Sequence, residues 1–279
     1  MAEVRYRDYR KYQQQRDATN TAVMGLLAAS HMSSATLHMN RGSSHTLSEL
    51  YPTVPYIHRF NLRADIAQQV LDDADATVAL LAIPQIIAIQ EDLLKGMLRM
   101  IATNSPGASR SLYNDAKSAT VHERLERHSR VSVDPDALEI FHLLRVARNT
   151  HIHAGGRADV TLVDRRASLS HSAEAAWSRI TRAPAPTYSM GREFRFRYAD
   201  LIAMLAVAKR LARDANTALQ ACVPRQVWAA MVLADWRQET SKHNLSAAQV
   251  ESKVMGFARR FYSPLAITRE EAAFAISQQ

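Results

Sequence analysis

The chain has 279 residues, which allows one large or two small domains, and its hydrophobic content is that of an ordinary globular protein. Its formal net charge is +8, and 29 of its 35 basic residues are arginines. This excess of arginine over lysine favours an anionic partner such as RNA, although genomic base composition can also produce the excess. The lone cysteine, Cys222, excludes an intrachain disulfide and a cysteine-based zinc site.

Abundant Ala and Leu with sparse Gly and Pro favour helices over sheets. No apolar run reaches the roughly 20 residues that a membrane span needs, and the first residues lack the apolar core of a signal peptide. We therefore expect an all-α protein in the cytoplasm, without a membrane partner.

In the first half of the chain, the pattern predicts helices separated by polar loops. A first helix is expected over 8–40, followed by a Ser-, Pro- and His-rich loop over 42–62. A long helical region should run over 64–103, where Pro84 predicts a kink or two helices end to end. A turn at 104–107 and a further helix over 108–128 complete this half.

The next helix, over 134–154, is strongly apolar and ends in polar residues. Asp134 and Pro135 suit its N-cap and first turn, and Gly155-Gly156 suit its C-terminal end. Its last turns read Arg148-Asn149-Thr-His-Ile-His153. Because such groups are costly to bury without partners, a chemical role is a serious candidate for them.

The remaining segments differ in character. Residues 157–194 read as an insertion or a surface connection with a short strand at 160–163, and 192–198 alternates apolar and basic residues, as in a half-buried strand or an RNA-contacting edge. Helices are expected over 198–221, 225–238, 246–262 and 268–277. Capping boxes are expected for the last two, at Ser246 with Gln249 and at Thr268 with Glu271.

A helical projection of the 134–154 helix separates its polar side chains. Arg145, Asn149 and His153 fall on one side, and Asn149 can touch His153 four residues on. Arg148 projects near Phe141, at the edge of the apolar arc. One straight helix therefore does not bring Arg148 and His153 onto one face.

The Arg148-Asn149-x-x-x-His153 pattern on an apolar helix resembles the motif of the HEPN family, whose nuclease members carry Arg, four to six residues, then His. Spacing alone is not diagnostic, because Arg166 and His171 repeat it in a Ser-rich segment. The resemblance implies a four- to five-helix bundle over 1–222, with an insertion at about 157–194 and a possible β-hairpin. Residues 223–279 would then be a helical C-terminal extension.

The resemblance also implies that two chains pair along this helix and line one cleft with their Arg and His residues. The expected activity is metal-independent RNA endonuclease cleavage without a cofactor, as in toxins or antiviral-defence effectors held by an antitoxin or regulatory protein. His153 would act as general acid–base, Arg148 would neutralise the transition-state phosphate, and Asn149 would orient His153 or bind the phosphate.

Two further residues of this helix are candidate RNA contacts. For Arg145 the alternative is an interface ion pair, and for His151 it is a buried structural role. At the level of function, the alternatives are an inactive HEPN-like module that binds RNA, a nucleotide or a partner protein, and an unrelated structural or interaction protein.

Other features each admit two interpretations. Asp72, Asp73 and Asp75 form a metal site or a solvated helix face, and Glu91 pairs with Lys95 or with Arg148. The basic and aromatic run at 5–12 stacks on bases or packs against helices, and Trp228 and Trp236 are expected in the core.

Overall fold

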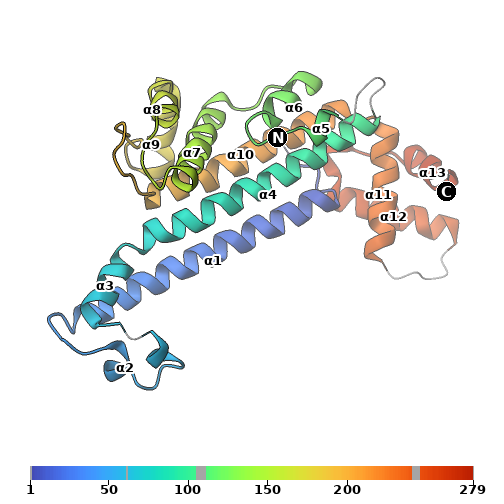
Figure 1. Cartoon of the computed structure of the whole chain (residues 1–279). Helices are drawn as coiled ribbons and strands as arrows, with labels where there is room; N and C mark the ends of the chain where they lie inside the picture. Colours follow the sequence, from blue (N-terminus) through green and yellow to red (C-terminus); the bar gives the residue numbers. More distant parts are fainter. Residues whose placement is uncertain (1, 61, 105–110, 241–245, 279) are drawn as a thin grey trace.

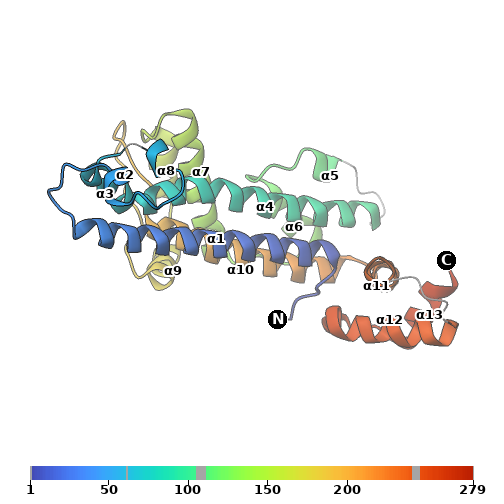
Figure 2. The ribbon, with the colours of Figure 1, turned by 90° about the horizontal axis from the view of Figure 1, so that it is seen from below.

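The computed structural model describes residues 2–60, 62–104, 111–240 and 246–278. Within these ranges the chain is helical or irregular and contains no β-strand, so the all-α prediction is confirmed. Three long helices form its axis: α1 (Arg7–His38), α4 (Ala74–Asn104) and α10 (Tyr198–Cys222) lie side by side (Figures 1 and 2). Their mutual packing buries the apolar stripes of α4 and α10.

Short elements cap the two ends of this axis (Figure 2). At one end lie α2 (Leu47–Leu50), a 3-10 turn (Ile57–Arg59) and α3 (Ala64–Asp72). Helices α3 and α4 follow end to end, but the chain divides at Asp73 rather than at Pro84, which lies inside α4. Packing of α4 against α1 and α10 along its length holds the helix through the proline.

The expected helix over 108–128 is wrong in its middle. The structure has a one-turn α5 (Ser111–Asn114) and a separate α6 (Val121–Ser129). Lys117 O accepts from the amides of Thr120 and Val121, which closes a turn between them, and Arg124 bonds the carbonyl of Leu112. The expected turn at 104–107 and the start of that helix lie almost entirely outside the described residues.

The motif helix α7 (Pro135–His153) has the expected boundaries. Asp134 Oδ1 accepts from Ala137 N at 3.1 Å, and Gly155 and Gly156 adopt left-handed φ values of 59° and 78° just beyond its C-terminus. The helix packs against α4, α10, α8 and α9, and its middle is buried. Pro135 at its start and the last turn, Ile152 and His153, are exposed.

The segment after α7 corrects two expectations. Val160–Ala167 is helix α8 and not a strand, and His171–Thr181 is α9. Side-chain caps from Asp159 and Ser170 begin them and override the β-propensity of 160–163. Trp177 of α9 is fully buried, so the segment belongs to the core and is not a surface connection.

The possible β-hairpin is also wrong for the described residues. Residues 192–197 are extended and pair with the rest of the chain through one isolated bridge, Arg157 with Glu193. Phe196 is buried and Arg195 is exposed, so the predicted alternation is present without a strand partner.

The C-terminal extension contains α11 (Arg225–Glu239), α12 (Ala247–Phe261), a 3-10 turn (Ser263–Leu265) and α13 (Arg269–Ser277). Both predicted capping boxes form, and Trp228 and Trp236 are buried as expected. The division at 222/223 stays a prediction, since Trp228 and Tyr262 share one apolar cluster with Tyr6 of the N-terminal segment.

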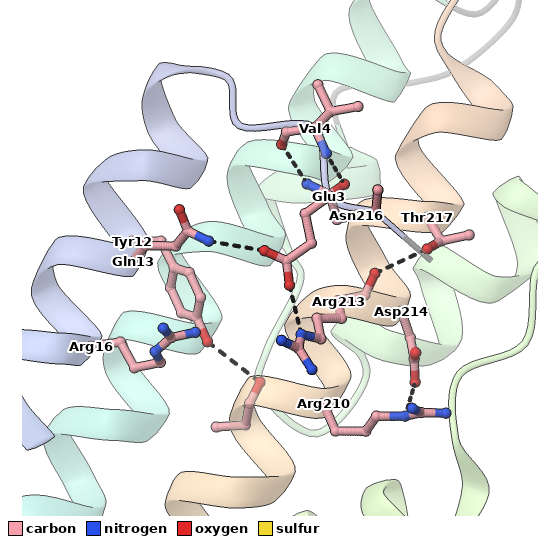
Figure 3. A network of polar contacts seen from close by, with 12 residues as sticks. Glu3, Val4, Tyr12, Gln13, Arg16, Arg210, Arg213, Asp214, Asn216 and Thr217 are labelled. Carbon is pink, nitrogen blue, oxygen red and sulfur yellow. Dashed lines mark hydrogen bonds and ion pairs between the residues drawn. The ribbon is translucent and has the colours of Figure 1, made fainter. Parts of the chain in front are cut away.

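The N-terminal segment is fixed against α10. Asn216 accepts from Val4 N and donates to Val4 O, both at 2.9 Å, and Arg213 pairs with Glu3 at 2.6 Å (Figure 3). Three tyrosines of the 5–12 run are buried against the helices: Tyr6, Tyr9 and Tyr12. Helix packing, not base stacking, therefore occupies these rings.

Helix α4 is long and apolar enough to cross a bilayer by length and composition. Here it lies between α1 and α10, and a core helix of a folded domain satisfies the same composition.

Candidate functional site

The exposed end of α7 presents a single stripe of side chains. Arg145, Arg148, Asn149 and Ile152 are spaced i, i+3, i+4 and i+7, so they share one face. The three polar residues are half-buried, and Ile152 is 53 % exposed. One turn earlier, Phe141 and His142 are buried, with the ring of His122 from α6 against them. This side of α7 is therefore buried at Phe141 and His142 and becomes partly exposed from Arg145 onward.

Arg148 and Asn149 contact each other directly. Arg148 Nη1 donates to Asn149 Oδ1 at 2.8 Å, which brings the guanidinium toward the polar side of the helix. His153 is exposed and forms no hydrogen bond or ion pair with any described residue. No hydrogen bond therefore joins Asn149 to His153, and the amide oxygen of Asn149 accepts from Arg148 instead.

Arg145 is held by a neutral histidine. Its Nε–H donates to His142 Nδ1 at 3.3 Å, so that nitrogen must carry a lone pair. Burial, together with the positive charges of Arg145 and Arg165, lowers the pKa of His142 to about 4. The ring therefore accepts this bond as neutral imidazole at neutral pH.

Beneath His142 lies a second buried imidazole. His122 stands edge-on to Phe141 at 5.1 Å and to His142 at 6.2 Å between ring centroids. Burial is the main cause that lowers its pKa, to about 3, and His142 adds to the shift. Both ring nitrogens lack a hydrogen-bond partner among the described residues. Neither histidine could be recognised from the sequence, because their burial depends on the contact of α6 with α7.

Arg165 is the basic residue of this region that sequence reasoning missed. It lies on α8, half-buried, and its charge acts on both His142 and Arg145. Because a strand was predicted at 160–163, no helix was expected that would carry Arg165 beside α7. The signal that identifies α8 from sequence is Asp159 as N-cap before Leu162, which is fully buried.

His151 faces a different environment from the other motif residues. Its ring packs against Phe194 and Phe196, at 5.8 and 5.9 Å between centroids, and lines a cavity of about 470 Å³ beside α3 and α4. Its Nδ1 is buried without a partner in the described part of the chain. These aromatic neighbours favour the structural alternative for His151, whose side chain lies on a different face of α7 from Arg145.

The three aspartates that the sequence offered as a metal site each contact a different partner. Asp72, Asp73 and Asp75 contact Ser34, Arg195 and His31 respectively, so their carboxylates do not converge. Among the described residues, no set of three His, Cys, Asp or Glu side chains is placed to hold a metal ion. Glu91 pairs with Lys95 at 2.6 Å and not with Arg148.

No protein-family model matches this chain, and neither the curated proteins nor the solved structures give a significant match. The chemistry of the site is therefore argued from its own residues.

Proposed function

We propose that this protein is a metal-independent RNA endonuclease of the HEPN type, with Arg148, Asn149 and His153 as its catalytic residues. One observation carries the proposal. A guanidinium, an amide and an imidazole lie within the last two turns of a helix whose middle is buried, with Arg148 bonded to Asn149 and His153 exposed. Polar groups held in this way at the end of a core helix are candidates for chemistry.

RNA supplies its own nucleophile, the 2′-hydroxyl. Cleavage needs a base to take the proton of that hydroxyl and an acid to protonate the leaving 5′-oxygen. It also needs a positive charge beside the anionic phosphorane. His153 performs the proton transfers because the ordinary pKa of histidine lies near neutrality. Arg148 stabilises the phosphorane, and Asn149 holds its guanidinium. The products are a 2′,3′-cyclic phosphate and a 5′-hydroxyl end, and DNA is not cut.

The site is completed by a second chain. Arg148 and His153 are five residues apart on one helix, so their side chains point in directions about 140° apart. Two copies that meet at their α7 ends place the Arg148 of one beside the His153 of the other. Exposed Ile152, between these positions, provides an apolar contact for that pairing. A toxin or antiviral-defence effector, restrained by an antitoxin or regulatory protein, is the context that fits such an activity.

The test uses purified protein and single-stranded RNA with a chelator present. Wild type should cleave, and His153→Ala should lose about 10²- to 10⁴-fold in rate. The matched control is His171→Ala, which removes an exposed histidine from the pair Arg166–His171 with the same spacing. Full cleavage by His153→Ala, or equal loss in both variants, would overturn the proposal.

A second candidate is an RNA-binding module without catalysis. It is favoured by the bond from Arg148 to Asn149, which leaves His153 without an orienting partner among the described residues. RNA bound tightly but left uncut by wild type would establish this alternative.

A further inference from the structure

Three arginines converge beside α7 without a counter-charge. Arg145 and Arg148 lie on α7 and Arg165 lies on α8, which packs against it, and all three side chains are half-buried. Throughout the ranges that the structure describes, none of the three forms an ion pair with a carboxylate. Their neighbours behave differently: Arg166 pairs with Glu174 at 2.7 Å, and Arg197 pairs with Asp200 at 3.0 Å.

In the part of the chain that the structure describes, no carboxylate of α7 or α8 forms an ion pair with this group. Glu139 accepts from Ser170 N, and Asp159 accepts from Leu162 N, each at 2.8 Å. Asp164 is exposed and has no ion pair in the described part of the chain. On α7 itself Arg145 meets the neutral ring of His142, and behind that ring lies His122 of α6, which is also neutral.

This arrangement is unfavourable in the free protein. Arg148 Nε is buried without a hydrogen-bond partner among the described residues. Burial and the charges of Arg165 and Arg148 lower the pKa of Arg145, so the charged form of that guanidinium is destabilised. A partly buried charge without an opposite charge beside it costs stability, and a bound anion reduces that cost.

We propose that Arg145, Arg148 and Arg165 form a phosphate-binding site for the RNA backbone, with Arg165 as a contact that α8 contributes to the α7 motif. The site rests on the proposed function for its natural ligand, but it binds whether or not cleavage follows. Guanidinium groups bind phosphate oxygens in bidentate fashion, and three of them around one open face match a phosphodiester and its neighbour.

The fold prepares Arg165 for this contact before the ligand arrives. The Asp159 carboxylate caps α8 and also accepts from Thr150 Oγ1 of α7 at 3.3 Å. Fully buried Leu162, one turn before Arg165, fixes that side of α8 in the core. The backbone at Arg165 is therefore held near α7 before RNA binds, which reduces the ordering cost of the contact.

The test compares neighbouring arginines with opposite environments. In a His153→Ala background, which prevents cleavage, binding of a single-stranded RNA oligonucleotide is measured by fluorescence anisotropy over a range of salt. Arg165→Gln should weaken binding about 10-fold at low salt and reduce the slope of log K against log salt by about 0.7. Arg165→Lys, which keeps the charge, should keep most of that slope.

The melting temperature of the free protein supplies the second readout. Arg165→Gln should leave it unchanged or raise it, because the substitution removes an unpaired charge. The matched control, Arg166→Gln, breaks the pair with Glu174 and should lower the melting temperature while RNA affinity stays at the reference value. A structural role for Arg165 predicts the reverse: a lower melting temperature with an unchanged salt slope. That result would overturn the site.

The two proposals fail separately. RNA binding with these salt slopes but no cleavage by wild type removes the endonuclease and keeps the phosphate site. Cleavage that depends on His153, with equal RNA binding by Arg165→Gln and Arg166→Gln, removes the phosphate site and keeps the endonuclease.

Discussion

At the residue scale, the buried histidines His142 and His122 beside Arg145 make stability depend on pH. The folded-state pKa values of about 4 for His142 and about 3 for His122 lie below the ordinary value of 6.5. As pH falls through 6.5, these two histidines become protonated in the unfolded chain but stay neutral in the folded chain. The free energy of unfolding therefore decreases from about pH 6.5 downward until each folded-state pKa is passed.

We predict that wild type loses stability between pH 7 and pH 5, by about 2 kcal/mol for each of these rings. His122→Phe keeps an aromatic ring against Phe141 and removes one titrating group, so it should lose about half as much. Urea unfolding at the two pH values measures the difference, with exposed His171→Ala as control. An identical pH dependence in wild type and His122→Phe would contradict this account.

At the element scale, the position of the candidate site depends on where α7 stops. Gly156 has a φ of 78°, and a Cβ placed there would meet the ring of His151 at 3.1 Å. The backbone turn and the packing of His151 therefore require glycine at this position. The Asp134 cap fixes the other end of α7, so the register of its polar residues is set from both termini.

Gly156→Ala should lower the free energy of unfolding by about 2 kcal/mol, because it combines an unfavourable φ with the contact to His151. Gly25→Ala is the opposite case, since this exposed position lies inside α1 with nothing within 4 Å of a new Cβ. It should raise stability by about 0.5–1 kcal/mol. Urea unfolding of both variants tests the pair, and a stabilising Gly156→Ala would be inconsistent with the described turn.

At the scale of the whole molecule, two apolar clusters lie along α4 and α10. One contains α7, α8 and α9, and the other joins the N-terminal segment to α11–α13. Backbone contacts strengthen the second, since Arg5 N donates to Phe261 O at 2.7 Å and Arg7 N donates to Asp235 at 2.8 Å. The chain start and the C-terminal extension are therefore parts of one core.

A chain that ends at residue 222 should not fold stably, because Tyr6, Tyr9 and Leu219 would lose the side chains that cover them. Within the full chain, Trp228→Ala should cost about 3–5 kcal/mol. Circular dichroism and thermal unfolding measure both effects. A native-like spectrum and an unchanged melting temperature for residues 1–222 would instead show that the extension folds separately.

The sequence alone determined the helices whose ends carry local signals. Asp134, Pro135 and the two glycines bounded α7, and the capping boxes at Ser246 and Thr268 bounded α12 and α13. These signals act between residues a few positions apart, so they can be recognised without the fold. The grouping of Arg148, Asn149 and His153 at one helix end was visible for the same reason.

Local sequence patterns do not show which groups share that end of the molecule. The turn between α5 and α6, the burial of His122 against Phe141, and the position of Arg165 all depend on how separate helices pack. Residues 160–163 show the limit: their strand propensity is real, but the Asp159 cap and the burial of Leu162 outweigh it. Packing energy comes from contacts between residues that are far apart in the sequence, so a local sequence pattern does not predict it.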